Sequence, residues 1–73
     1  MKLSIYQWRR AKNISQRKLA SLLGVHENTI RSWERHPERL TVEKAERIAE
    51  ALDVPLNSII FSSVTLQNVE ETI

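Results

Sequence analysis

Apolar residues recur three and four positions apart along most of this 73-residue chain, which is the spacing of one buried face on an α-helix. Runs of this kind predict helices over residues 4–11, 16–23, 27–35 and 42–52, and a short fifth helix over residues 56–60. From Phe61 onward the spacing has no clear period. We therefore expect a domain over residues 1–60 and a tail over residues 61–73 that is flexible or ordered only against a partner.

The residues at the helix boundaries agree with these ranges. A side chain that precedes a helix stabilises it by accepting a hydrogen bond from a free backbone N–H. Gly24 follows the last apolar pair of the second helix and fits the left-handed position at a helix end, where other residues are strained. With only one Gly and two Pro, the chain is expected to be all-α, a compact five-helix bundle. The expected N-caps are Ser4, Ser15, Thr41 and the weaker His26.

The composition excludes several classes of function. The chain has no cysteine, so it has no disulfide, thiolate metal site or catalytic thiol. His26 and His36 have no acidic cluster around them, so we expect no metal and no cofactor. No nucleophile–base pair or phosphate loop is visible, so we expect no enzyme activity. No apolar run approaches the roughly 20 residues that span a bilayer, and no signal peptide is recognisable, so we expect a cytoplasmic protein with no membrane contact.

Charge is unevenly distributed along the chain. Residues 1–39 carry nine Lys and Arg against three Glu, a net +6. Residues 40–73 carry two Lys and Arg against six Asp and Glu, a net −4. A basic half beside an acidic half suggests one surface that faces a polyanion. A solvated charged surface is the other interpretation.

Two short predicted helices joined at Gly24 form the arrangement that places one helix in a DNA major groove. The pattern reads Ser15-Gln16-x-x-Leu19-Ala20-x-x-x-Gly24-Val25, then Ile30-x-x-Trp33-Glu34, then Ala45-x-x-Ile48-Ala49-x-Ala51-Leu52-x-Val54. Over about residues 3–60 it resembles the Cro and phage-repressor type of helix-turn-helix family, also called XRE-like. The resemblance implies a five-helix, lambda-repressor-like DNA-binding domain that is usually dimeric on DNA and regulates transcription. Residues 27–35 would then be the recognition helix.

The outward-facing residues of that helix are the candidates for reading bases. With Ile30 and Trp33 buried, this set is Glu27, Asn28, Arg31 and Ser32. The resemblance places base contacts at Glu27, Asn28 and Ser32. Asn can bond adenine through two groups, and Glu can accept from the cytosine amino group. The other interpretation of Glu27 is a favourable charge at a helix N-terminus.

A second set of residues is expected to contact phosphates. Gln16 begins a helix, where free N–H groups attract an anion, and the resemblance implies that it holds a phosphate and braces the recognition helix. The resemblance also implies an ion pair between Arg9 and Glu34. Each arginine considered singly could equally be only solvated. The candidate phosphate contacts are Gln16, Arg17, Arg35 and Arg39.

The last predicted helix and the tail are more apolar than a small domain requires. We interpret five residues as a dimer or partner surface. In the alternative interpretation, Ile59 and Phe61 complete the core and the tail is loose. The five residues are Ile59, Ile60, Phe61, Val64 and Leu66.

Two functions remain open from the sequence. The first is a sequence-specific, double-stranded DNA-binding regulator of transcription, acting as a homodimer on a palindromic operator with half-sites about 34 Å apart. The second is an antirepressor or antitoxin-like module that binds another regulatory protein, such as a repressor. The modest net charge, Glu27 and the apolar tail favour the second.

Overall fold

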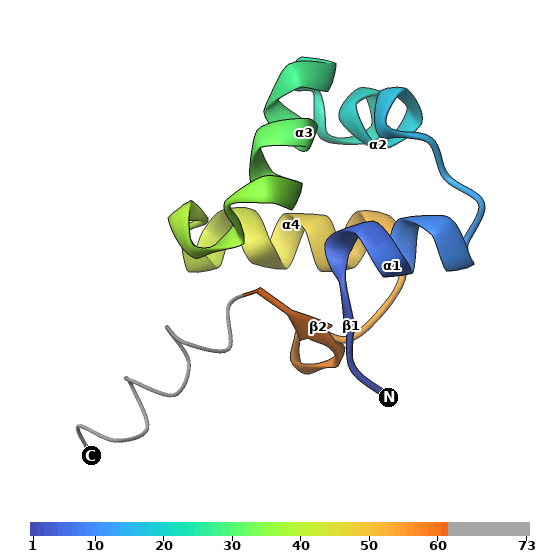
Figure 1. Cartoon of the computed structure of the whole chain (residues 1–73), viewed down its shortest axis with the longest axis vertical. Coiled ribbons are helices and arrows are strands. Elements are labelled where there is room, and N and C mark those ends of the chain that lie inside the picture. The colour runs from blue at the N-terminus through green and yellow to red at the C-terminus, as the bar shows by residue number, and fades with distance from the viewer. Residues whose placement is uncertain (62–73) are drawn as a thin grey trace.

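The computed structural model describes residues 1–61 and contains four α-helices within them. These are α1 (Ile5–Ala11), α2 (Gln16–Leu23), α3 (Glu27–Arg35) and α4 (Val42–Leu52). Two single turns of 3-10 helix, η1 (Pro37–Arg39) and η2 (Leu56–Ser58), and two short strands, β1 (Leu3–Ser4) and β2 (Ile59–Ile60), complete the chain order. In Figure 1, α2 and α3 lie together at one end of the molecule, α4 passes beneath them, and β1 and β2 lie at the other end. The four longer predicted helices are confirmed to within one residue at each end.

Side-chain caps begin the helices at the predicted residues. Ser4 accepts from the backbone N–H of Gln7 at 3.1 Å, and the Gln7 side chain accepts from the Ser4 N–H at 2.9 Å, a reciprocal capping box. Ser15 and Thr41 accept from the N–H three residues later, at 3.0 and 3.2 Å. Each cap satisfies an N–H that has no partner inside its helix.

Three helices end in the same way, with a residue in the left-handed conformation. Asn13, Gly24 and Asp53 have φ values of 58°, 70° and 59°. In each case the N–H of the next residue donates to the carbonyl five positions earlier, at 2.9–3.0 Å. This next residue is apolar every time and packs against the core: Ile14, Val25 and Val54. Each helix end therefore turns the chain and directs an apolar side chain inward.

The prediction of a fifth helix over residues 56–60 was wrong. The segment makes one 3-10 turn and then extends, and Ile59 and Ile60 pair in parallel with Leu3 and Ser4. Five residues are too few for a stable α-helix, and two consecutive β-branched residues favour extended backbone. Within the described residues, the fold is therefore four α-helices with a two-stranded sheet of two residues per strand. The predicted compact, mostly helical domain is confirmed, but the predicted count of five helices is not.

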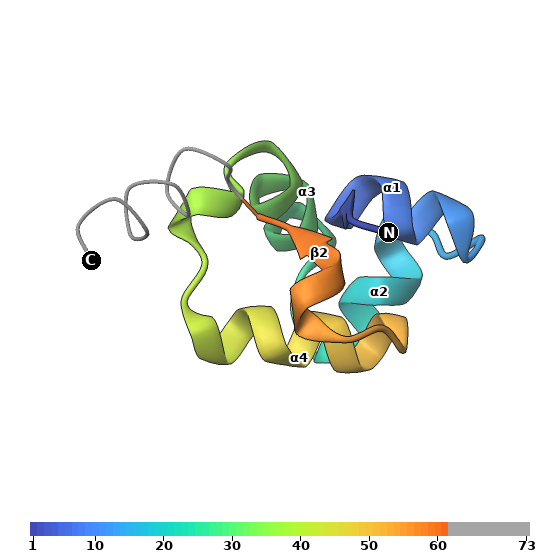
Figure 2. The same ribbon diagram turned by 90° about the horizontal axis from the view of Figure 1, so that it is seen from below.

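One apolar core joins all of these elements. Figure 2 shows η2 and β2 lying across the underside of the helices, between α1 and α4. The Trp8 indole Nε1 donates to the Ser58 carbonyl oxygen at 2.7 Å and ties α1 to this segment. The buried cluster consists of Ile5, Leu19, Ala20, Leu23, Ile30, Ile48, Ala49, Leu52 and Ile59.

Candidate nucleic-acid interface

The turn between α2 and α3 has a defined geometry. Gly24 occupies the left-handed position, and a side chain added there would have no atom within 4 Å, so the backbone angle alone selects glycine. From α4, the Arg47 guanidinium donates to the Leu23 carbonyl oxygen at 3.0 Å, which satisfies an acceptor left free at the end of α2. The left-handed conformation of Gly24 and the hydrogen bond from Arg47 of α4 therefore both help to hold the angle between α2 and α3.

The helix α3 begins at an unusual cap. The Nδ1 atom of His26 accepts a hydrogen bond from the Asn28 backbone N–H at 3.2 Å. Only a ring nitrogen without a proton can accept, so this cap uses an imidazole unprotonated at Nδ1. Ile30 of α3 is fully buried, and Trp33 packs partly against the core. The opposite face of α3 is exposed to solvent.

The candidate base-reading residues lie together on that outer face. Asn28, Arg31 and Ser32 are exposed, and Glu27 is partly exposed. Arg31 Nη1 donates to Asn28 Oδ1 at 2.7 Å, and Arg31 Nη2 lies 3.7 Å from Glu27 Oε2. Three of the four candidates thus form one connected group at the start of α3.

A buried polar network fixes α3 against α1 and α2. Arg9 Nε donates to Glu34 Oε2 at 2.7 Å, and the two side chains are 8% and 7% exposed. Arg9 also donates to the Ile14 carbonyl oxygen at 3.0 Å, and Gln16 Nε2 donates to Glu34 Oε1 at 2.9 Å. The carboxylate of Glu34 therefore accepts hydrogen bonds from both α1 and α2. Such a network holds the far end of α3 in place rather than adding much net stability.

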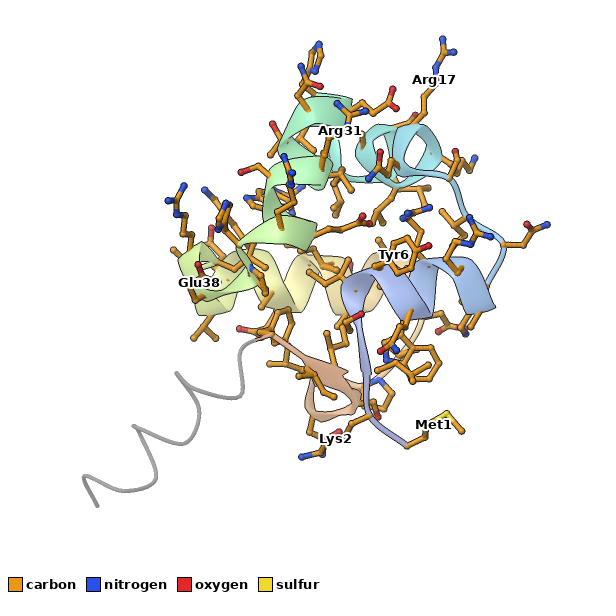
Figure 3. All side chains as sticks on the ribbon, in the orientation of Figure 1. Met1, Lys2, Tyr6, Arg17, Arg31 and Glu38 are labelled. Atoms are coloured by element: carbon orange, nitrogen blue, oxygen red, sulfur yellow. The ribbon has the colours of Figure 1, made fainter. Side chains whose placement is uncertain are left out.

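The beginning of α2 borders an open polar groove between α1 and α3. The cations Arg10, Arg17 and Lys18 are exposed around it, together with the free N–H groups of the first turn of α2. Figure 3 shows Arg17 and Arg31 extending at the same end of the molecule, away from Met1 and Lys2. The groove is lined by Arg9, Arg10, Asn13, Ile14, Ser15, Gln16, Arg17, Lys18 and Glu27.

The sequence reasoning missed Arg10, Asn13 and Lys18 in this groove. Arg10 lies in the last turn of α1 and Lys18 in the first turn of α2, so they meet only because the chain reverses at Asn13. The basic residues on both sides of the Ser15 cap were the available signal.

Two further predicted phosphate contacts lie at the other end of α3. Arg35 ends this helix and Arg39 ends η1, and both are exposed. Between them, His36 Nδ1 lies 3.5 Å from Glu38 Oε2. Cations therefore flank the outer face of α3 at both of its ends.

The predicted apolar surface requires a correction. Ile59 is 3% exposed and belongs to the core, because its side chain points inward from β2. Phe61 is partly buried against the same core, whereas Ile60 is 38% exposed and Leu56 is 36% exposed. Val64 and Leu66 lie outside the described residues.

Residues 1–61 lack two other kinds of feature. No group of three His, Cys, Asp or Glu side chains in this part of the chain is arranged to hold a metal ion. None of the helices described here is long and apolar enough to cross a membrane.

The fold and this face together define a DNA-binding helix-turn-helix domain. A comparison with protein families matches residues 5–59 to a helix-turn-helix family. The chain belongs to this family, which is the helix-turn-helix family of the Cro and phage-repressor type and regulates transcription by binding DNA. Comparison with curated proteins and comparison with solved structures each give no match.

Proposed function

We propose that the chain is a sequence-specific regulator of transcription of the phage repressor or Cro kind, which places α3 in the major groove of double-stranded DNA. One observation carries this proposal. The outer face of α3 is polar and open, while the buried Arg9–Glu34 pair fixes the inner side of the same helix. A helix presented in this way can meet base edges without losing its own packing.

The residues divide into two roles. Glu27, Asn28, Arg31 and Ser32 would choose the sequence, because they project from the first turns of α3. The side chains that surround this face would bind phosphates and supply affinity without sequence preference. The proposed phosphate contacts are Gln16, Arg17, Arg35 and Arg39, to which the groove adds Arg10 and Lys18.

Gln16 has a particular place among them. One N–H of its amide donates to Glu34, which fixes the side chain at the mouth of the groove. Its oxygen cannot bond a phosphate, so the phosphate contact would come from its second amide hydrogen and its backbone N–H. Gln16 would thereby connect the DNA backbone to the network that holds α3.

We further propose that two copies bind a palindromic operator, with half-sites one helical turn, about 34 Å, apart. Exposed Ile60 and Leu56 offer an apolar area on the side of the molecule away from α2 and α3. A homodimer joined there would keep both α3 helices free for DNA.

The experiment is selection from a random duplex library by the purified chain at near-physiological salt. An enriched inverted repeat would support a dimeric, sequence-reading regulator and give its operator. Asn28→Ala should then lose discrimination at one base pair, by roughly 1–3 kcal/mol. Glu50→Ala, on the exposed side of α4, is the matched control and should leave the selected sequence unchanged. Binding that is weak, salt-sensitive and without enrichment would refute the proposal.

A second candidate is a module that captures another regulatory protein, as antirepressors and antitoxins do. The exposed apolar pair Leu56 and Ile60 favours it. Ile60→Asp tests this candidate, because a charge there would abolish capture of a partner. The proposed homodimer uses the same apolar area, so α3 of this variant should still select a single half-site but no longer an inverted repeat. Deleting residues 62–73 tests the same role for the tail, which lies outside the described residues.

A further inference from the structure

Arg31 lies between two side chains that are proposed to read bases. It follows Asn28 by three positions and Glu27 by four, so the three side chains share one face of α3. One nitrogen of its guanidinium donates to the Asn28 amide oxygen at 2.7 Å. The other terminal nitrogen lies 3.7 Å from a Glu27 carboxylate oxygen. A single planar cation therefore contacts both of its neighbours.

We propose that Arg31 is a positioning residue, which orients Asn28 so that this side chain reads guanine. This inference rests on the proposed function. A guanidinium has only donors, so the amide atom that faces it is the oxygen. The Asn28 amino group is then turned away from Arg31 and is the part free to meet a base.

This orientation changes which base Asn28 suits. Adenine requires both a donor and an acceptor from an asparagine, because its major-groove edge carries one of each. Guanine presents two acceptors, N7 and O6, which match the two hydrogens of an amino group. Arg31 holds the Asn28 oxygen on its own side, although that oxygen keeps a second lone pair, so Asn28 presents its amino group to the base and guanine becomes its preferred partner.

The same contact allows Glu27 to approach DNA. A lone carboxylate at this place would be repelled by phosphates, but the nearby guanidinium balances its charge. The Arg31 contact is to Oε2, which leaves Oε1 free to accept from the amino group of cytosine. Arg31 is 50% exposed and Glu27 41% exposed, so the pair is weak in water and gains strength when DNA excludes that water.

The test compares four proteins in duplex selection: wild type, Asn28→Ala, Arg31→Lys and the double variant. Lysine keeps the charge but lacks the planar fork that can contact two groups at once. We expect Asn28→Ala and Arg31→Lys to lose preference for guanine at the same base pair, each about tenfold, and the double variant to lose no more. Arg31→Lys should keep the salt dependence of wild-type binding, because the number of cations is unchanged.

Three results would overturn the inference. In the first, Arg31→Lys retains the wild-type preference, as a simple phosphate contact would. In the second, Arg31→Lys loses preference at a different base pair from Asn28→Ala, which would make Arg31 an independent reader. In the third, the base pair lost with Asn28 is adenine–thymine rather than guanine–cytosine.

A measurement without DNA separates this inference from the proposed function. Nitrogen-15 relaxation of the Asn28 side-chain amide reports its order in the free protein. We expect that order to fall in Arg31→Ala and to stay at the wild-type level in Ser32→Ala, which removes another exposed side chain of α3. An amide that is equally ordered in Arg31→Ala would refute positioning by Arg31, whatever the DNA result. If the wild type shows an ordered amide but selects no sequence, the proposed function fails, and the reading role of Asn28 fails with it.

Discussion

Replacing Glu34 by alanine would leave Arg9 as an uncompensated cation inside the domain. The two side chains are 8% and 7% exposed, and the Glu34 carboxylate accepts from Arg9 and from Gln16 at 2.7 and 2.9 Å. Removing one partner of a buried pair costs about 3–5 kcal/mol, because the remaining charge stays away from water. An exposed pair would cost only about 0–1 kcal/mol.

This loss is large relative to the whole domain. A chain of this length has a free energy of unfolding of roughly 4–11 kcal/mol, taking about 0.05–0.15 kcal/mol per residue. Glu34→Ala therefore removes a large part of the stability. The matched control is Glu50→Ala, an exposed carboxylate on α4 with no pair in the described residues, which should change the stability by less than about 0.5 kcal/mol.

A double replacement distinguishes stability from positioning. Arg9→Met with Glu34→Leu removes both charges, and such apolar replacements of a buried pair are often neutral or stabilising. Gln16 then loses its acceptor on α3, so we expect retained stability with weaker selection of DNA sequence. This result would show that the Arg9–Glu34 pair orients α3 more than it stabilises the fold.

Urea unfolding followed by far-ultraviolet circular dichroism measures the three stabilities. A cost below about 1 kcal/mol for Glu34→Ala would refute the reasoning, because the pair would then behave as an exposed one. A double variant as unstable as Glu34→Ala would refute the separation of roles.

Three further changes have defined outcomes. Gly24→Ala should cost about 1–2 kcal/mol in thermal unfolding through its positive φ alone, and a loss below about 0.3 kcal/mol would contradict this. Asp53→Gly should stabilise the domain by about 0.5–1 kcal/mol, because it relieves a left-handed residue and removes an anion at the end of α4, and a drop in Tm would contradict it. Arg17→Ala should lower the slope of log affinity against log salt by about 1 without changing the selected sequence, and a changed sequence would make Arg17 a base reader.

Local rules explain most of what the sequence predicts correctly. Ser15 and Thr41 cap helices by accepting hydrogen bonds from residues three positions later. Gly24 adopts the left-handed conformation, in which glycine is favoured over other residues. Each of these signals involves residues only a few positions apart, so it can be recognised in the sequence alone. The partner of Ser4 in its capping box, Gln7, is an equally local signal because it stands three residues later, but it was not among the predictions.

The parts that the sequence did not predict depend either on contacts between distant residues or on the rotamer of a single side chain. Ile59 and Ile60 are extended because Leu3 and Ser4 offer a strand to pair with, and no local pattern reveals that partner. The contact of Arg31 with both neighbours on α3 depends on which rotamer its long side chain adopts. Spacing places these residues on one face but does not determine their hydrogen bonds.

The pairing of β1 with β2 has a consequence for the synthesis of this protein. Ile5 and Trp8 leave the ribosome before β2 does, yet the Trp8 indole bonds a carbonyl 50 residues further along the chain. Until Ile59 has left the ribosome, the core that the four helices share in the nascent chain lacks this side chain. We expect such a chain to be open to proteases and chaperones until Ile60 is released. Control of transcription would thus begin only after β2 has left the ribosome.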